Sequence, residues 1–143
     1  SIRVLSRTVR PATEGEMEAL ALEEEEPVFF LQRVFYADNT PAILASNAIP
    51  LAALRLPPEQ CDGQLPIDQL IMSCCDAQIA YDIFDIGAVL PDAEARAALA
   101  LAEVRPLLHL RQVFYDRQNE PLLCGSSLYD DKLLGLRLVQ SWA

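Results

Sequence analysis

Two stretches of the sequence match when the chain is shifted by 79 residues, which places Pro27 on Pro106. The shift superposes Val28-Phe29-Phe30-Leu31-Gln32-Arg33-Val34-Phe35-Tyr36 on Leu107-Leu108-His109-Leu110-Arg111-Gln112-Val113-Phe114-Tyr115. Both stretches are rich in the aromatic and branched residues that favour strands. Each is followed by a turn, Ala37–Pro41 in the first copy and Asp116–Pro121, one residue longer, in the second. Each copy therefore predicts a β-hairpin.

The same shift aligns a predicted helix in each half. Ala19-Leu20-Ala21-Leu22 is repeated without change as Ala98-Leu99-Ala100-Leu101. Thr13 and Glu16 form a capping-box pattern at the first helix, and Asp92 is the expected cap of the second. A strand precedes each helix, at residues 2–10 and 79–89. Each half is thus predicted to run strand, helix, strand, hairpin turn, strand.

With the remaining segments included, residues 1–143 are predicted to form a single domain with an α+β fold. A helix is expected from Ile67 to Ala77 between the halves, and a final apolar strand from Leu133 to Trp142. If the two halves join edge to edge, they form one antiparallel sheet with helices mostly on one side. Residues 28–36 are apolar at both odd and even positions, so we expect helices to cover one face and a pocket or a second subunit the other.

Composition excludes several classes of protein. The net charge of −10 is opposite to the basic footprint that nucleic-acid binding needs. No stretch is apolar enough to span a bilayer and the start lacks a signal-peptide pattern, so we predict a cytoplasmic protein without membrane contact. The four cysteines lack metal-ligand spacing and His109 is the only histidine. We therefore predict free thiols that are buried or partly buried, and neither metal nor cofactor.

The ordered motifs resemble those of a known family. Pro27 to Pro41 is similar to the first signature of UTRA domains, which are the effector-binding domains of GntR-superfamily, HutC-subfamily transcription regulators. Pro106 to Pro121 resembles the second signature, and Leu128 to Lys132 resembles the closing tyrosine-and-acid element of the family. The resemblance covers nearly the whole chain from Ile2.

The resemblance implies a chorismate-lyase-like fold that has lost catalysis and binds a small metabolite. It also implies a homodimeric regulator, most simply a repressor, in which a winged helix-turn-helix domain precedes this one. Nothing in the present sequence matches such a domain. DNA binding would then depend on sequence outside these 143 residues.

The resemblance also suggests where a ligand would bind. Sensors of amino-sugar phosphates in this family use an Arg-x-Arg pair on the first signature strand, because guanidinium groups match phosphate and carboxylate oxygens. Here Arg33 occupies the first position and Phe35 the second. A structural or interface role for Arg33, and core packing for Phe35, are the alternatives to ligand contact.

Other expected pocket positions also differ from the family pattern. An acidic residue is replaced by Ala45, with Asn47 the nearest polar substitute, and the hydroxyl-bearing positions before the middle helix correspond to Leu65 and Ile67. Tyr129, by contrast, is the residue type that the family pattern has at this position. With one arginine and no acid, the pocket would offer too few charged and hydrogen-bonding partners to the phosphate and hydroxyl groups of a phosphorylated sugar. We therefore expect a monoanionic or neutral metabolite with an apolar body, held by Arg33 and stacked on Phe35.

Two other functional classes stay open at this point. A chorismate-lyase-like enzyme is compatible with the fold, because fold does not fix function, although no hydrolase, phosphate-loop or zinc-protease motif is present. A ligand-free dimerisation module is the third possibility. We predict no enzymatic activity.

Overall fold

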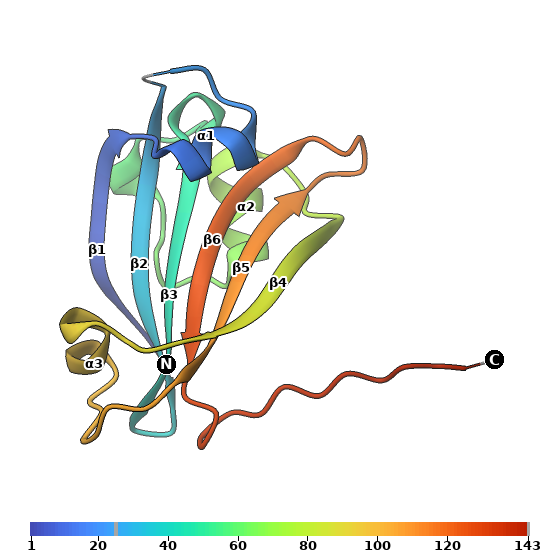
Figure 1. Cartoon of the computed structure of the whole chain (residues 1–143). Coiled ribbons are helices and arrows are strands. Elements are labelled where there is room, and N and C mark those ends of the chain that lie inside the picture. Colours follow the sequence, from blue (N-terminus) through green and yellow to red (C-terminus); the bar gives the residue numbers. More distant parts are fainter. Residues whose placement is uncertain (25, 143) are drawn as a thin grey trace.

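The computed structural model describes residues 1–24 and 26–142 and contains one six-stranded antiparallel sheet with three α-helices. The strands follow the order β1-β2-β3-β6-β5-β4 (Figure 1). The elements are β1 (Ile2–Pro11), α1 (Glu14–Leu20), β2 (Pro27–Ala37), β3 (Thr40–Pro50), 3₁₀ turns at Leu51–Ala53 and Pro58–Gln60, α2 (Ile67–Cys75), β4 (Tyr81–Val89), α3 (Ala93–Ala98), β5 (Leu107–Tyr115) and β6 (Pro121–Tyr129).

The predicted duplication is confirmed by the strand registers. From Ser6, which pairs with Gln32, to Arg10, the register of β1 with β2 is the same as that of β4 with β5 after a shift of 79 residues. The hairpins β2–β3 and β5–β6 carry irregularities at the equivalent residues Phe35 and Phe114. The halves join through β3 and β6, where Ser46 faces Ser126. The sheet therefore has a pseudo-two-fold axis at its centre.

The two helices of the repeat begin and end alike. Thr13 caps α1 through a complete capping box, and Asp92 accepts a hydrogen bond from the Ala95 backbone at the start of α3, as predicted. After the helices, Ala21 and Ala100 adopt left-handed conformations with φ of 52° and 51°. These equivalent residues end the helices in the same way.

Two of the three α-helices of the described chain lie on one face of the sheet, as the sequence predicted for most of them, and α2 lies on the other face. The α1–α3 face carries both repeat helices, packed on residues such as Val28, Val34 and Leu44. The α2 face carries α2 and the 3₁₀ turns, packed on Phe29 and Leu31. α2 and its flanking turns therefore shield this part of the sheet from solvent.

The prediction of a strand at Leu133–Trp142 is wrong. Residues 135–142 have no regular secondary structure and extend away from the sheet (Figure 1). Leu138, Val139 and Trp142 are 74%, 91% and 88% exposed. Side chains as apolar as these are usually buried, but these three are not covered by any other part of the described chain. The helix expected to reach Ala77 ends at Cys75, followed by Asp76 in a left-handed conformation.

Candidate functional site

Four of the predicted site residues lie together on the α2 face. Arg33 is opposite Ala45, and Ala45 is opposite Ser127. In the adjacent row, Phe35 and Tyr129 flank the same residue of β3. Directly opposite residues of antiparallel strands point to the same face. These residues of β2, β3 and β6 therefore share one small area of the sheet.

Ser127 belongs to this area but was not predicted from the sequence. It is buried, at 9% exposure, between Ala45 on β3 and Leu110 on β5. The duplication contains the signal that could have identified it. With the longer second turn included, Ser127 is the counterpart of Asn47.

Arg33 is the buried charge at the centre of this area. Its Nη1 donates hydrogen bonds to the carbonyl oxygens of Gly63, at 3.1 Å, and Leu65, at 2.6 Å. The residue is 1% exposed, its buried Nε has no hydrogen-bond partner, and no acidic side chain pairs with it among the described residues. Its guanidinium carbon lies 5.2 Å from the centroid of the Phe35 ring. Burial lowers the pKa of Arg33 below its usual value.

The loop that supplies these carbonyls, residues 57–66, is held closely against β1 and β2. Arg7 donates from Nη1 to the carbonyl oxygen of Cys61, at 2.9 Å. Gly63 comes so near β1 that an added Cβ would lie 2.6 Å from Val4 Cγ2. Arg7 and Arg33 therefore anchor the loop to two adjacent strands.

The other predicted residues have different surroundings. The side chains of Leu65 and Ile67 pack against the apolar core beneath α2, so Leu65 meets Arg33 through its backbone only. Asn47 is buried one row beyond Arg33, opposite Gly125. An added Cβ on Gly125 would lie 2.5 Å from Asn47 Nδ2, so the glycine leaves room for this amide.

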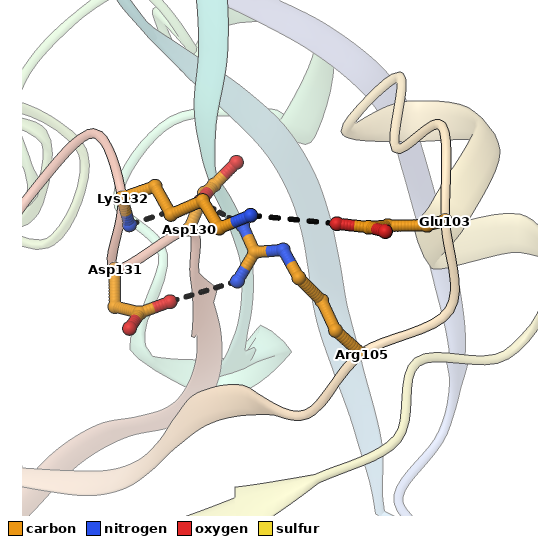
Figure 2. A network of polar contacts seen from close by, with 5 residues as sticks. All are labelled: Glu103, Arg105, Asp130, Asp131 and Lys132. Carbon is orange, nitrogen blue, oxygen red and sulfur yellow. Dashed lines mark hydrogen bonds and ion pairs between the residues drawn. The ribbon is translucent and has the colours of Figure 1, made fainter.

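Tyr129 stands at the end of β6, directly before a network of charged side chains. Burial raises the pKa of the Tyr129 hydroxyl above its usual value. Arg105 binds both Asp130 and Asp131, and Lys132 reaches Glu103 (Figure 2). Both acids that follow Tyr129 are thus paired with one cation, Arg105, from the segment between α3 and β5.

A separate open groove of about 670 Å³ lies on the α1–α3 face. Its lining includes Ser46 and Ser126 from the central strands, Glu16 from α1, and Asp85 and Arg111 from β4 and β5. A smaller hollow of about 270 Å³ occupies the pseudo-symmetric position beside α3 and includes the same two serines. Sequence comparison with the family did not indicate this groove.

Within residues 1–24 and 26–142, no cluster of His, Cys, Asp and Glu has the composition of a metal site. All four cysteines are buried and free, as predicted. No helix of the described chain is sufficiently long and apolar to cross a bilayer.

The family model for the UTRA domain matches residues 1–132, and the chain therefore belongs to the UTRA domain family. Its fold closely resembles the ligand-binding domain of a protein described as a GntR-family transcriptional regulator from Bordetella bronchiseptica. That match has a TM-score of 0.90 and 21% identity, covering 99% of this chain and 90% of the other.

The effector domain of PhnF from Mycobacterium smegmatis is similar, with a TM-score of 0.87 and 23% identity over 98% of this chain and 86% of that domain. Against the longer PhnF structure, the TM-score is 0.89 at 23% identity, and the match covers 98% of this chain but 62% of PhnF. A sequence search of curated proteins found no match.

Proposed function

We propose that this domain is the small-molecule sensor and dimerisation domain of a cytoplasmic GntR-type, HutC-subfamily repressor. Its DNA contacts would be made by a separate winged helix-turn-helix domain. Membership of the UTRA family and the fold shared with GntR-family effector domains support this proposal. The ligand would bind on the α2 face, between Arg33, Phe35 and Tyr129.

The observation that carries the proposal is the buried charge of Arg33. A buried cation is stabilised when a carboxylate or phosphate accompanies it, and two backbone carbonyls supply only partial compensation. Arg33 has these two carbonyls and a free Nε. An anionic ligand would complete the set of acceptors around this guanidinium.

Entry of the ligand would require the loop at residues 57–66 to move, because Arg33 is 1% exposed. In this mechanism the carbonyl oxygens of Gly63 and Leu65 accept hydrogen bonds from the Arg33 guanidinium until the anionic ligand, a stronger acceptor, replaces them. A charge-assisted hydrogen bond is about twice as strong as a neutral one. Ligand binding would thus shift the population from a closed to an open loop.

The ligand class follows from the charges of the site. Among Arg33, Phe35, Ala45 and Tyr129, one residue is a cation and none is an acid. A small carboxylate with an apolar body matches one guanidinium beside an aromatic ring. A phosphorylated amino sugar would lack partners for its second negative charge and its amine.

Calorimetric titration of the chain with small carboxylic acids and with amino-sugar phosphates tests this ligand class. We expect a carboxylate to bind and Arg33→Lys to weaken its binding at least about tenfold, since lysine keeps the charge but loses the planar fork. Arg111→Lys on the opposite face is the matched control and should leave affinity unchanged. Tight binding of amino-sugar phosphates would contradict the proposed class.

A folding control keeps this test interpretable. The melting temperature of each unliganded variant separates loss of binding from loss of structure, and Phe35→Leu tests the same site if Arg33→Lys does not fold. If Arg111→Lys alone abolishes binding, the site lies in the groove of the α1–α3 face. A saturating ligand at 100 times its Kd should stabilise the wild type by about 2.7 kcal/mol.

The alternative functions have distinct outcomes. Release of pyruvate from chorismate would identify an enzyme, which we do not expect. A ligand-free dimerisation module would show no thermal shift with any member of a metabolite panel.

A further inference from the structure

The two central strands, β3 and β6, carry a repeated pattern of small and polar residues on the α2 face. When the extra residue of the second turn is included in the shift, Ala45 falls on Gly125 and Asn47 falls on Ser127. Because the strands are antiparallel, Ala45 lies opposite Ser127 and Asn47 lies opposite Gly125. Each polar side chain therefore faces a residue with a small side chain or none, on either side of the pseudo-two-fold axis.

Asn47 and Ser127 are buried polar residues among apolar neighbours. They are 8% and 9% exposed, whereas Ile49 and Leu123 on the same strands and Leu110 beside Ser127 are buried apolar residues. Within the described chain, neither the Asn47 amide nor the Ser127 hydroxyl takes part in a side-chain hydrogen bond. A buried polar group without a partner destabilises a fold. Stability therefore does not account for these two side chains.

The two polar residues lie next to the buried cation of the same face. Arg33 is opposite Ala45, which is opposite Ser127, so one small residue separates the strand positions of the guanidinium and the hydroxyl. Adjacent strands are about 4.8 Å apart, so the backbones of Arg33 and Ser127 are about 10 Å apart. Asn47 and Tyr129 each follow two positions further along β3 and β6 and so point to the same face. Four polar side chains thus surround Ala45.

The charges around Ala45 restrict the chemistry of a ligand. Arg33 is the only charged residue of the set, whereas the hydroxyls of Ser127 and Tyr129 and the amide of Asn47 are neutral groups that both donate and accept hydrogen bonds. Such groups satisfy a hydroxyl or a carbonyl. A second carboxylate, or an ammonium group, would be buried without an opposite charge at a much greater cost.

We infer that Ser127 and Asn47 determine the specificity of the Arg33 site, and that they select a monocarboxylate bearing one hydroxyl or carbonyl group. This inference rests on the proposed function, which places a carboxylate at Arg33, and it adds a second recognised group. The carboxylate binds the guanidinium, the ligand lies over Ala45, and its hydroxyl or carbonyl pairs with Ser127 and Asn47. A ligand without this group leaves both side chains unpaired and binds more weakly.

A series of acids that share one aromatic body tests this selection by calorimetry on the full 143-residue chain. The parent acid is 3-phenylpropanoate, phenyllactate and 3-hydroxy-3-phenylpropanoate each add one hydroxyl, and benzylmalonate adds a second carboxylate. We expect at least one hydroxy acid to bind at least about tenfold more tightly than the parent acid. Benzylmalonate should bind at least about tenfold more weakly than that hydroxy acid.

Two neighbouring serines provide the variant and its matched control. Ser127→Ala should weaken binding of the preferred hydroxy acid at least about tenfold and leave the affinity for the parent acid unchanged. Ser126→Ala should change neither affinity, because Ser126 lines the groove on the opposite face. Melting temperatures of the unliganded variants confirm that they fold. Asn47→Ala tests the same preference if Ser127→Ala does not fold.

The outcomes separate this inference from the proposal on which it rests. Equal weakening of both acids by Ser127→Ala would indicate a packing role for the serine and overturn the inference. Equal affinity of the wild type for the parent acid and both hydroxy acids would also overturn it. In both cases Arg33→Lys would still weaken binding of the parent acid, and the carboxylate site would stand. If Arg33→Lys has no effect, or none of the acids binds, both are overturned.

Discussion

Ser46 and Ser126 face each other across the central strand pair and occupy equivalent positions in the two halves of the sequence. Both also line the two pseudo-symmetric hollows of the α1–α3 face. The central pairing therefore fixes the position of each half relative to the other. Changes next to this pair should affect the whole domain.

Gly125, beside Ser126, provides such a change. A methyl group at this position would meet the backbone oxygen of Ser46 and the amide of Asn47, neither of which can move freely. We expect Gly125→Ala to lower the free energy of unfolding by about 1–3 kcal/mol, the usual effect of overpacking. Urea denaturation measures this change in the free energy of unfolding. Gly87→Ala, a strand glycine with its nearest contact at 4.0 Å, is the control, and an equal loss there would contradict the explanation.

The pair of Arg10 and Glu16 predicts a pH dependence. Burial alone raises the pKa of Glu16, but hydrogen bonds from the Arg10 side chain and the Thr13 backbone outweigh it and hold the pKa below the usual value. The carboxylate therefore stabilises the fold above about pH 4.5, and this contribution is lost as the pH falls through the lowered pKa. Glu16→Gln should lower stability by about 1 kcal/mol at pH 7, with a smaller difference at pH 3.

Glu14 in the same helical turn is the control for this experiment. It is exposed, and Glu14→Gln should not reproduce the pH-dependent difference. Denaturation curves at pH 3, 5 and 7 for the three chains make the comparison. A Glu16→Gln effect of the same size at every pH would show that the charge is not responsible.

The attachment of the extended residues 135–142 to the sheet depends more on Asp130 than on Asp131. Asp130 is buried and bound by Arg105, whereas the side chain of Asp131 is 53% exposed. Asp130→Asn should reduce the free energy of unfolding by about 1–3 kcal/mol, because it weakens a charge-assisted hydrogen bond in a buried position. Asp131→Asn should change it by less than about 1 kcal/mol. Thermal denaturation of the two variants ranks them, and the reverse order would refute this assignment.

The cysteines offer a probe of the proposed loop movement. Burial raises the pKa of Cys61, in the loop, to about 11 and that of Cys124, in β6, to about 12. Both thiols should react slowly at pH 8, since the thiolate is the reactive form. If a ligand displaces the loop from Arg33, labelling of Cys61 should accelerate at least about tenfold while Cys124 remains protected.

Variants that keep only Cys61 or only Cys124, with alanine at the other cysteines, allow each rate to be measured alone. Labelling of Cys61 that is unchanged at saturating ligand would mean that the loop stays closed. In that case the ligand does not reach Arg33 by the proposed route. Faster labelling of both thiols would indicate general unfolding.

The architecture could be predicted from the sequence because it is repeated. The 79-residue shift aligned strands, helix caps and turns between the two halves. This alignment does not depend on the secondary-structure propensity of any single residue, so each half supported the prediction for the other. The segment containing α2 occurs once, so the repeat could not indicate which face it covers. Its packing on Phe29 and Leu31 is a tertiary contact that local pattern does not specify.

The candidate site could be predicted only in part. Family resemblance located Arg33, Phe35, Ala45 and Tyr129, and the strand registers bring these residues together. The contacts of Arg33 with two carbonyls were not predictable, since they depend on a loop that is distant in sequence. The segment Leu133–Trp142 shows a related limit, because its hydrophobicity predicted a strand whereas residues 135–142 extend away from the sheet.

The left-handed alanines after α1 and α3 indicate where the domain could be engineered. An alanine in this conformation is strained by about 1 kcal/mol or more, and glycine is not. Ala21→Gly and Ala100→Gly should therefore each raise the melting temperature, and the two gains should add because the residues end separate helices in opposite halves. Both alanines follow helices on the α1–α3 face, so these substitutions should stabilise the domain without changing the area around Arg33.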